Sequence, residues 1–182
     1  MNFLLTNIPD GQIIQPTVYP DERGFFMESY QKQKFVQAGI PYDFVQDNHS
    51  SSKKFTVRGL HYQVTHSQGK LVRVIIGEIF DVAIDLRKKS PHYGKYVGVY
   101  LSAENKHQLW IPPGFGHGFF TLTPRADVIY KATDYYHKEG ERCIRWDDPD
   151  LGIEWPIPEG ITPIISEKDS SAPSFNQAEV FS

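Results

Sequence analysis

The sequence predicts an all-β fold, a double-sheet jelly roll with a few short peripheral helices. The chain carries 13 prolines and 14 glycines, scattered rather than clustered, and 14% of its residues are aromatic. This composition is typical of many short strands joined by turns. Short apolar or alternating runs, about ten in number, follow one another along the chain, and only one segment has the pattern of a helix. A double sheet of this kind leaves a mouth between its layers where a ligand can bind.

The length and charge of the chain limit its class. Its 182 residues, 40% of them hydrophobic, suit a single domain over residues 1–182. A net charge of -3 favours neither nucleic acid nor an anionic membrane as a partner, so local basic residues must hold any anionic ligand. Cys143 is the only cysteine, which excludes an intrachain disulfide and a multi-cysteine metal site. Without a basic leader or an apolar run of about 18 residues, we expect a cytoplasmic protein.

The N-terminal part predicts an edge strand and the helix. Residues 13–19 form a strand that Pro16 confines to a sheet edge. Residues 29–38 form the helix, with Ser29 as its N-cap and Gly39 just after its end. Further strands are expected over residues 42–46, 55–63, 96–101, 108–111, 118–122 and 128–133, with an exposed loop over residues 50–54.

The clearest hairpin joins residues 70–76 to residues 79–86. Gly77 stands where a two-residue turn is required. In the second arm the apolar residues share one face, and Asp81 and Asp85 share the other. Solvation is the default interpretation of these carboxylates, and a polar cavity lined by them is the alternative.

One stretch in the predicted strand 55–63 carries a candidate catalytic group. His61 and Gln63 share a strand face with Gly59, while Leu60 and Tyr62 take the other face. Gly59 leaves room beside a titratable ring, and a histidine so placed can transfer protons near neutral pH. The alternative is a hydrogen-bonded histidine of the core or rim.

Metal and nucleotide-hydrolysis motifs are missing from the sequence. None of the seven histidines forms a His-x-His or His-x-x-x-His pair, and Gln63 stands where a chelating strand would place a second histidine. The run 114–118 is glycine-rich but lacks the lysine and hydroxyl of a phosphate-binding loop, and no serine sits in a nucleophile elbow. We therefore expect acid and base chemistry that needs no metal and no cofactor.

Several motifs occur in a specific order along nearly the whole chain: residues 21–26 with Glu28, then 44–48, 58–61, 69–73, 77–82, 109–112, 116–119, 130–133 and 167–169. In this order and spacing the sequence closely resembles the dTDP-4-dehydrorhamnose 3,5-epimerase family. It departs from the family at Gly116, where alanine is common, and in a slightly shorter loop before Gly69. Neither departure affects a proposed catalytic group.

The resemblance implies a cupin-like barrel and a reaction without a cofactor. Enzymes of this family invert C3 and C5 of dTDP-4-dehydro-6-deoxy-D-glucose to give dTDP-4-dehydro-L-rhamnose. Both carbons lie next to the C4 ketone, so removal of either proton gives an enolate whose oxyanion must be stabilised. Two alternatives are a relative that inverts only C3 or only C5 of a related keto sugar, and a non-catalytic module that binds a sugar nucleotide.

The resemblance also implies four catalytic roles. His61 corresponds to the general base, and Asp169 to the carboxylate that orients it. Tyr130 corresponds to the acid that returns a proton from the opposite face, and Lys70 to the cation at the enolate oxygen. Without the resemblance, these last three would be interpreted as a solvated tail residue, a strand aromatic and an exposed loop lysine.

Other residues match substrate contacts of the family. Arg58 and His117 correspond to contacts with the diphosphate or the sugar, and Tyr135 to an aromatic that packs on the base. Arg23 and Phe26 correspond to residues that an exchanged N-terminal strand supplies to the neighbouring subunit, which implies a homodimer with a shared site. Further nucleotide and sugar positions are Glu28, Gln46, Asp47, Asn48, Glu141 and Lys168.

Overall fold

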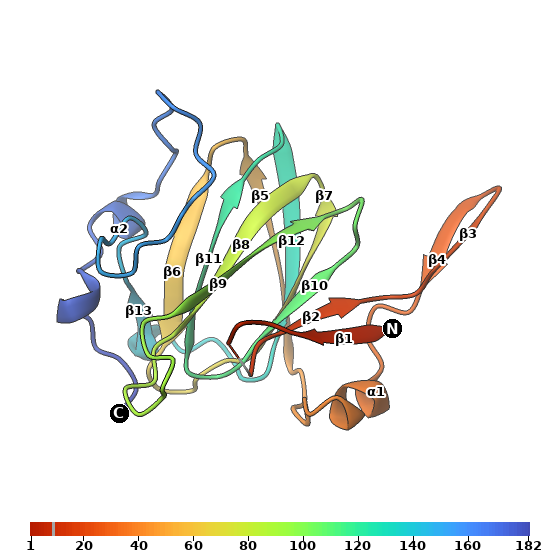
Figure 1. The fold of residues 1–182 in the computed structure, drawn as a ribbon, viewed down its shortest axis with the longest axis horizontal. Coiled ribbons are helices and arrows are strands. Elements are labelled where there is room, and N and C mark those ends of the chain that lie inside the picture. Colours follow the sequence, from red (N-terminus) through yellow and green to blue (C-terminus); the bar gives the residue numbers. More distant parts are fainter. Residues whose placement is uncertain (9) are drawn as a thin grey trace.

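The computed structural model describes residues 1–8 and 10–182, and it confirms the predicted all-β double sheet (Figure 1). One sheet has six strands in the order β1 (Asn2–Leu5), β2 (Gln12–Gln15), β10 (Gln108–Ile111), β7 (Lys70–Ile76), β12 (Arg125–Ala132) and β5 (Gln46–Lys53). The other has five, in the order β13 (Glu141–Cys143), β6 (Val57–Gln63), β11 (Phe115–Thr121), β8 (Glu78–Asp85) and β9 (Tyr96–Ser102). Neighbouring strands pair antiparallel.

Smaller elements surround the two sheets. A separate hairpin consists of β3 (Val18–Asp21) and β4 (Gly24–Met27). The α-helices are α1 (Lys32–Gln37) and α2 (Glu167–Ser170), and the short 3-10 helices are η1 (Lys138–Gly140) and η2 (Phe175–Gln177). In the part of the chain that the structure describes, no helix is both long enough and apolar enough to cross a membrane.

Alternation along the strands divides the apolar side chains among three clusters. The first fills the space between the sheets, where Val72 and Phe115 are members from the two layers. The second lies on the outer face of the five-stranded sheet, which residues 144–181 cover. In the third, Phe35 of α1 and Trp110 pack on the outer face of the six-stranded sheet. The five-stranded sheet is thus buried on both faces, and Asp81 and Asp85 have no solvated side to face.

The predicted hairpin of residues 70–76 and 79–86 is wrong. Both strands exist, but β7 lies in the six-stranded sheet and β8 in the five-stranded sheet, so Gly77 forms a corner between the layers. Its φ is 75°, and a Cβ there would come within 2.1 Å of the carbonyl oxygen of Arg125. A glycine with positive φ suits a tight turn and a sheet corner equally well, and the local sequence does not distinguish them.

Other boundaries also differ from the sequence expectation. Of the strand expected over residues 42–46, only Gln46 lies in a strand, as the first residue of β5. The helix begins at Lys32, and its N-cap is Gln31, not Ser29, because the Gln31 side chain accepts a hydrogen bond from Lys34 N at 2.7 Å. Residues 50–53 continue β5 instead of forming a loop, since an edge strand paired with β12 tolerates polar side chains. The strand expected over residues 13–19 divides into β2 and β3, and β1 and β13 were not predicted.

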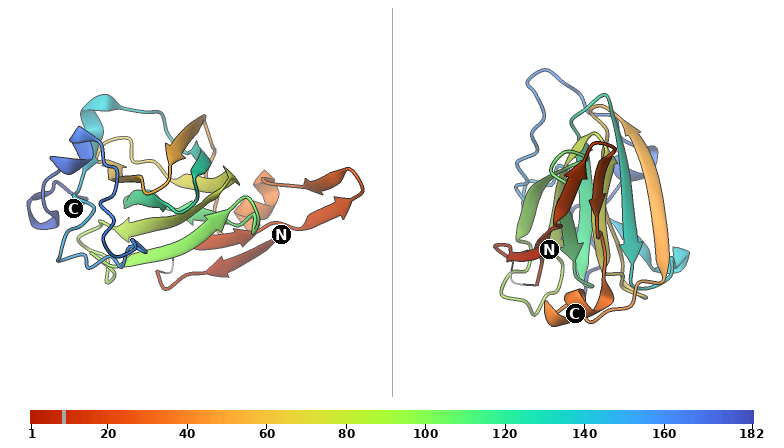
Figure 2. Two further views of the ribbon diagram at one scale, coloured as in Figure 1. Left: turned by 90° about the horizontal axis from the view of Figure 1, so that it is seen from above. Right: turned by 90° about the vertical axis from the view of Figure 1, so that its right-hand side faces the viewer.

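The β3–β4 hairpin projects from the body of the molecule, far from β6 (Figures 1 and 2). Tyr19, Phe25 and Phe26 on this hairpin are exposed, and Phe26 is 70% accessible. Large apolar groups displayed on a projecting arm are typical of an interaction surface.

Gly59 has a different role from the one expected. A Cβ on Gly59 would not enter the cavity; it would lie 2.5 Å from the Cα of Gly118 on β11. The glycine therefore permits close approach of β6 and β11, and this approach places His61 directly opposite His117 in the strand register.

We expect Gly59→Ala to lower the free energy of unfolding by about 2–4 kcal/mol, because the added methyl group must separate two backbones. Gly24→Ala is a matched control: its φ of 134° is close to the 128° of Gly59, but a Cβ there meets nothing within 4 Å. Urea unfolding measures both. Equal losses for the two variants would mean that backbone conformation, not strand approach, requires Gly59.

Candidate active site between the sheets

A cavity of about 190 Å³ opens between the two sheets and gathers titratable side chains from both. Its walls come from β6 and β11 on one side and from β7 and β12 on the other. The polar and charged residues that line it include Arg58, His61, Gln63, Lys70, His117, Tyr130, Tyr136 and Glu141. Six of the residues singled out in the sequence as catalytic or binding groups meet here: Arg58, His61, Lys70, His117, Tyr130 and Glu141.

His61 and Asp169 form a hydrogen-bonded pair across 108 positions of sequence, with 2.7 Å between Nε2 and Oδ1. Asp169 is 3% exposed, so the interpretation as a solvated tail residue is wrong. Its second oxygen accepts a hydrogen bond from Gly59 N at 3.1 Å, and Ser166 caps α2 by accepting one from Asp169 N. Burial alone would raise the pKa of Asp169, but the hydrogen bond from His61 and those at Gly59 and Ser166 outweigh burial and lower the pKa. Asp169 is therefore a carboxylate.

A second histidine–carboxylate pair faces the first. His117 Nε2 lies 2.7 Å from Asp81 Oδ1, and both residues are buried. Solvation of Asp81 and Asp85 is contradicted, because both are fully buried; Asp85 instead binds Arg87 and Ser90. Burial lowers the pKa of His117, against the opposing charge of Asp81, so the ring is neutral at pH 7.

Lys70 begins β7 and points into the cavity, where it is 8% exposed. No hydrogen bond or ion pair joins its ammonium to another described residue; Nζ lies 5.7 Å from the centre of the Tyr130 ring. Burial lowers the pKa of Lys70 from 10.5 to about 8, although Asp81 and Glu141 oppose the shift. Lys70 is therefore a buried cation that can pair with an anionic group of a ligand. The interpretation as an exposed loop lysine is wrong.

Tyr130 approaches the cavity from the six-stranded sheet. It lies opposite Asn48 of β5 and Val72 of β7, and its ring centre is 6.4 Å from that of His117. Burial and the nearby Glu141 raise the pKa of Tyr130, so the phenol keeps its proton at neutral pH. A protonated phenol and an imidazole thus occupy opposite walls of one cavity.

Basic groups and an aromatic loop surround the mouth. Arg58 is oriented by β5, donating to Ser52 Oγ at 2.9 Å and to Ser51 O at 3.2 Å. Glu141 binds Lys168 at 2.6 Å and accepts a hydrogen bond from the Tyr136 hydroxyl at 3.0 Å. Tyr135 on the same loop is 64% exposed.

Other predicted binding residues do not join the cavity within one chain. Asp47 faces the outer side of the six-stranded sheet and binds Lys131 at 3.0 Å. Arg23 pairs with Asp21 on the projecting hairpin, which also carries Phe26. Glu28 pairs with Lys34 of α1. Gln46 donates to Asn48 at 3.1 Å along β5.

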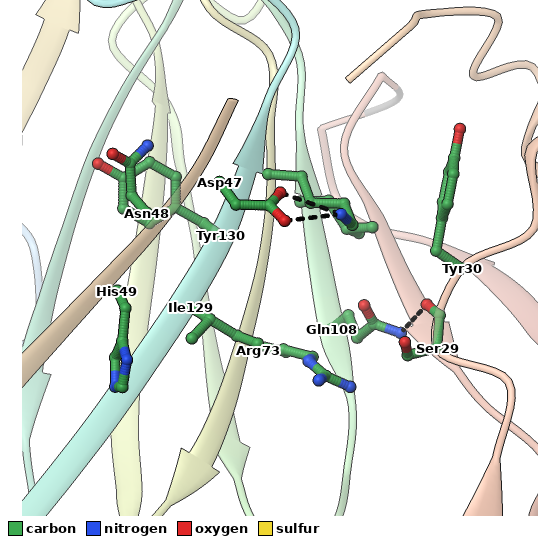
Figure 3. A pocket seen from close by; sticks show the side chains of 11 residues that line it. Ser29, Tyr30, Asp47, Asn48, His49, Arg73, Gln108, Ile129 and Tyr130 are labelled. Carbon is green, nitrogen blue, oxygen red and sulfur yellow. Dashed lines mark hydrogen bonds and ion pairs between the residues drawn. The ribbon is translucent and has the colours of Figure 1, made fainter. Parts of the chain in front are cut away.

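A second cavity, of about 310 Å³, lies on the outer face of the six-stranded sheet (Figure 3). Figure 3 shows Asn48 and Tyr130 close together, Asp47 joined to a lysine, and Gln108 joined to the backbone of Ser29. Arg73 extends into this cavity, and burial lowers its pKa. The same sheet therefore presents a polar site on each of its faces.

The sequence did not identify Tyr136, Ser51 or Ser52 as parts of the site, and for Asp81 it left solvation as the default and a polar cavity as the alternative. A carboxylate that alternates with apolar residues was the available signal for Asp81. The serines and Tyr136 carry no signal, because their partners lie on other elements.

One group of side chains has candidate metal ligands among the described residues. His61, Cys143 and Asp169 place one ligand atom each within 4.8 Å of one another. Burial raises the pKa of the Cys143 thiol to about 12, and His61 and Asp169 already bind each other. The group is therefore better described as a histidine–carboxylate pair beside a packed thiol than as a metal site.

Comparison with known proteins identifies the family. The family model described as dTDP-4-dehydrorhamnose 3,5-epimerase matches residues 5–177. The chain belongs to the dTDP-4-dehydrorhamnose 3,5-epimerase family. An epimerase of this name from Pseudomonas aeruginosa is 53% identical over 175 residues, covering 96% of each chain.

Solved structures of family members share the fold. The enzyme from Legionella pneumophila, in complex with dTDP-4-keto-L-rhamnose, superposes with a TM-score of 0.93 at 51% identity, covering 98% of this chain and 94% of that one. The Bacillus anthracis enzyme, with TDP and PPi bound, gives a TM-score of 0.91 at 42% identity, covering 95% and 98%. The predicted family, cupin-like fold and enzyme class are confirmed.

We expect Lys70→Met to raise the free energy of unfolding at neutral pH by up to about 3 kcal/mol. The lowered pKa means that the folded state disfavours the ammonium; this cost is present in full below pH 8 and is relieved as the pH rises toward 10.5. The gain should therefore shrink across that range. Urea unfolding near neutrality and at about pH 10 measures it. Lys89→Met, at an exposed lysine, is the control, and a gain for Lys70→Met that is equal at both pH values would contradict the expectation.

Proposed function

We propose that the cavity between the sheets carries out 3,5-epimerisation of dTDP-4-dehydro-6-deoxy-D-glucose, giving dTDP-4-dehydro-L-rhamnose through enolate intermediates. The observation that carries this proposal is that Lys70, a buried cation without a partner among the described residues, lines the same cavity as His61 and Tyr130, which come from opposite walls. The relative crystallised with dTDP-4-keto-L-rhamnose supports the choice of substrate.

His61 acts as the base. Asp169 accepts the hydrogen bond from Nε2, which leaves the Nδ1 lone pair free to remove a proton from C3 or C5. The buried carboxylate also stabilises the imidazolium that forms. The imidazolium then loses its proton to solvent, and the base is restored for the second carbon.

Lys70 stabilises the charge that this step creates. The electrons of the broken C–H bond move to the C4 oxygen, and an ammonium buried in a site of low dielectric interacts strongly with the enolate. Because His117 is neutral, Lys70 is the cation that this scheme assigns to the C4 oxygen. No redox cofactor takes part in this scheme, since the ketone already accepts the electrons.

Tyr130 acts as the acid. A phenol with a raised pKa stays protonated until an enolate is present, and Tyr130 approaches from the wall opposite His61. Proton removal on one face and proton return on the other invert the carbon. The tyrosinate is then reprotonated from solvent.

Cations at the mouth hold the diphosphate. Arg58 and Lys168 line a neighbouring cavity of about 500 Å³ that also reaches His61 and Asp169. Their side chains supply the local positive charge that an acidic protein needs for an anionic ligand. Tyr135 contacts the base, and Gln46, Asn48 and Glu141 contact the nucleotide and sugar.

A homodimer completes the site. Arg23 and Phe26 lie on the projecting hairpin, away from the cavity of their own chain (Figure 1). In the dimer that we propose, the hairpin brings them to the partner's substrate. Cytoplasmic localisation, the roles of Glu28 and Asp47, and the expectation of no metal stay predictions.

Incubation with dTDP-4-dehydro-6-deoxy-D-glucose in deuterated water, followed by proton NMR, tests the function. We expect deuterium at both C3 and C5 of an L-configured product. His61→Asn should abolish exchange while leaving dTDP binding within about threefold, because the base acts only in the chemical step. His92→Asn, at a histidine remote from the cavity, is the control and should be fully active.

The same experiment separates the alternatives. Deuterium at only one carbon would replace the proposal with a single-site epimerase. Binding without any exchange would indicate a non-catalytic sugar-nucleotide module. Full activity of His61→Asn would overturn the role of the base.

Mixing two inactive variants tests the exchanged hairpin. One carries Arg23→Ala with Phe26→Ala, and the other carries His61→Asn. If the hairpin serves the partner, each mixed dimer has one intact site, and random mixing should restore about a quarter of the original activity. A mixture of Lys70→Met with His61→Asn is the control, since both changes lie in the cavity of their own chain and no site is restored. No recovery in the first mixture would contradict exchange.

A further inference from the structure

Four consecutive residues beside the cavity, 134–137, have no helix or strand of their own. This segment, which we call the tyrosine loop, carries Tyr135 and Tyr136. Backbone groups outside regular structure need other hydrogen-bond partners, and a loop without them is mobile. The partners of the tyrosine loop therefore determine how well its two aromatic side chains are placed.

Glutamine side chains supply a partner to each of the four residues. Gln68 Nε2 donates to Asp134 O at 2.8 Å, and Tyr136 N donates to Gln46 Oε1 at 3.0 Å. Gln63 makes the other two bonds. Its Nε2 donates to Tyr135 O at 3.2 Å, and its Oε1 accepts from His137 N at 2.8 Å.

Gln63 is the central member of this group. It is 5% exposed, and Nε2 also donates to His66 O at 2.7 Å, so both ends of its amide are used. It lies on β6, two residues after His61 and paired in register with Glu141 of β13. One strand, β6, thus carries both the proposed base and the glutamine that binds the tyrosine loop.

The tyrosine loop controls one rim of the cavity. The Tyr136 hydroxyl donates to Glu141, which in turn binds Lys168, so displacement of the loop would disturb a connected series of three groups. None of them touches Lys70 or Tyr130 through a hydrogen bond. Loss of loop placement should therefore affect binding at the mouth more than proton transfer.

We propose that Gln63 is a positioning residue, which holds the tyrosine loop so that Tyr135 and Tyr136 are preorganised for the nucleotide end of the substrate. This inference rests on the proposed function for the identity of the ligand. The hydrogen bonds of Gln63 order the loop in the free protein, so ligand binding does not have to supply the free energy for ordering it.

The variant Gln63→Met tests this role, because methionine has a similar length and volume but cannot make the three hydrogen bonds. We expect KM for the keto sugar nucleotide and Kd for dTDP to rise by about tenfold, with kcat within about threefold. Gln68→Met, which removes one bond at the other side of the loop, should act in the same direction by about threefold. Thermal unfolding confirms that the variants are folded, and if Gln63→Met is not, Gln68→Met carries the test.

A double-mutant cycle distinguishes positioning from general structural support. If Gln63 acts through the loop, Gln63→Met should change dTDP affinity by less than about twofold in a protein that already carries Tyr135→Ala and Tyr136→Phe. An undiminished effect in that background would overturn the proposal. A fall in kcat with unchanged KM would also overturn it.

Calorimetry with dTDP needs no turnover, so the two proposals can fail separately. If Gln63→Met weakens dTDP binding equally with and without the two tyrosine substitutions, while the protein is an active epimerase, only the role of Gln63 is rejected. If the effect of Gln63→Met on dTDP binding disappears in the tyrosine variant, but the protein exchanges no substrate protons, only the epimerase reaction is rejected.

Discussion

The hydrogen bond between His61 and Asp169 is the interaction on which the rest of the site depends. It joins β6, an inner strand of the five-stranded sheet, to the short helix α2 near the C-terminus. The same carboxylate accepts the amide of Gly59, so it orients the imidazole and also ties the C-terminal segment to β6. Lys168, the residue before Asp169, is brought to Glu141 as a direct consequence. Orientation of the base and closure of the rim therefore have one physical origin.

Burial of charge is the second constraint. It lowers the stability of the folded protein but provides a charged group for the proposed reaction. Asp81 and Asp169 are compensated by histidines, whereas Lys70 has no partner among the described residues and is disfavoured in its charged form. A core that served only stability would hold an apolar side chain at this place. An ammonium that lacks an anion in the free protein is, however, well suited to stabilise one that forms during reaction.

Much of this protein was predictable from residue patterns and their order. Scattered prolines, glycines and aromatics predicted the all-β double sheet, because many short strands need many turns. The order of motifs predicted the family, and with it His61, Lys70, Tyr130 and Asp169 as one site. The structure brings these four together, although their chemical roles stay predictions.

Other features could not be predicted from short stretches of sequence. A glycine turn looks the same whether the chain folds back within a sheet or crosses to the opposite layer, so the hairpin at Gly77 was misassigned. Solvation was the default interpretation of Asp81, because the sequence of β8 does not show that residues 144–181 cover the apolar face of this strand. Gln63 binds backbone groups more than 70 positions away, and such contacts leave no pattern in sequence.

The sequence by itself determined the fold class and the chemical inventory, because strand periodicity and turn residues are local and side-chain chemistry is carried by residue identity. Only the tertiary structure decided which charges are paired, which are buried and which side of a sheet each residue faces. Those properties depend on contacts between distant segments, and a change of partner strand alters them without any change in the local pattern.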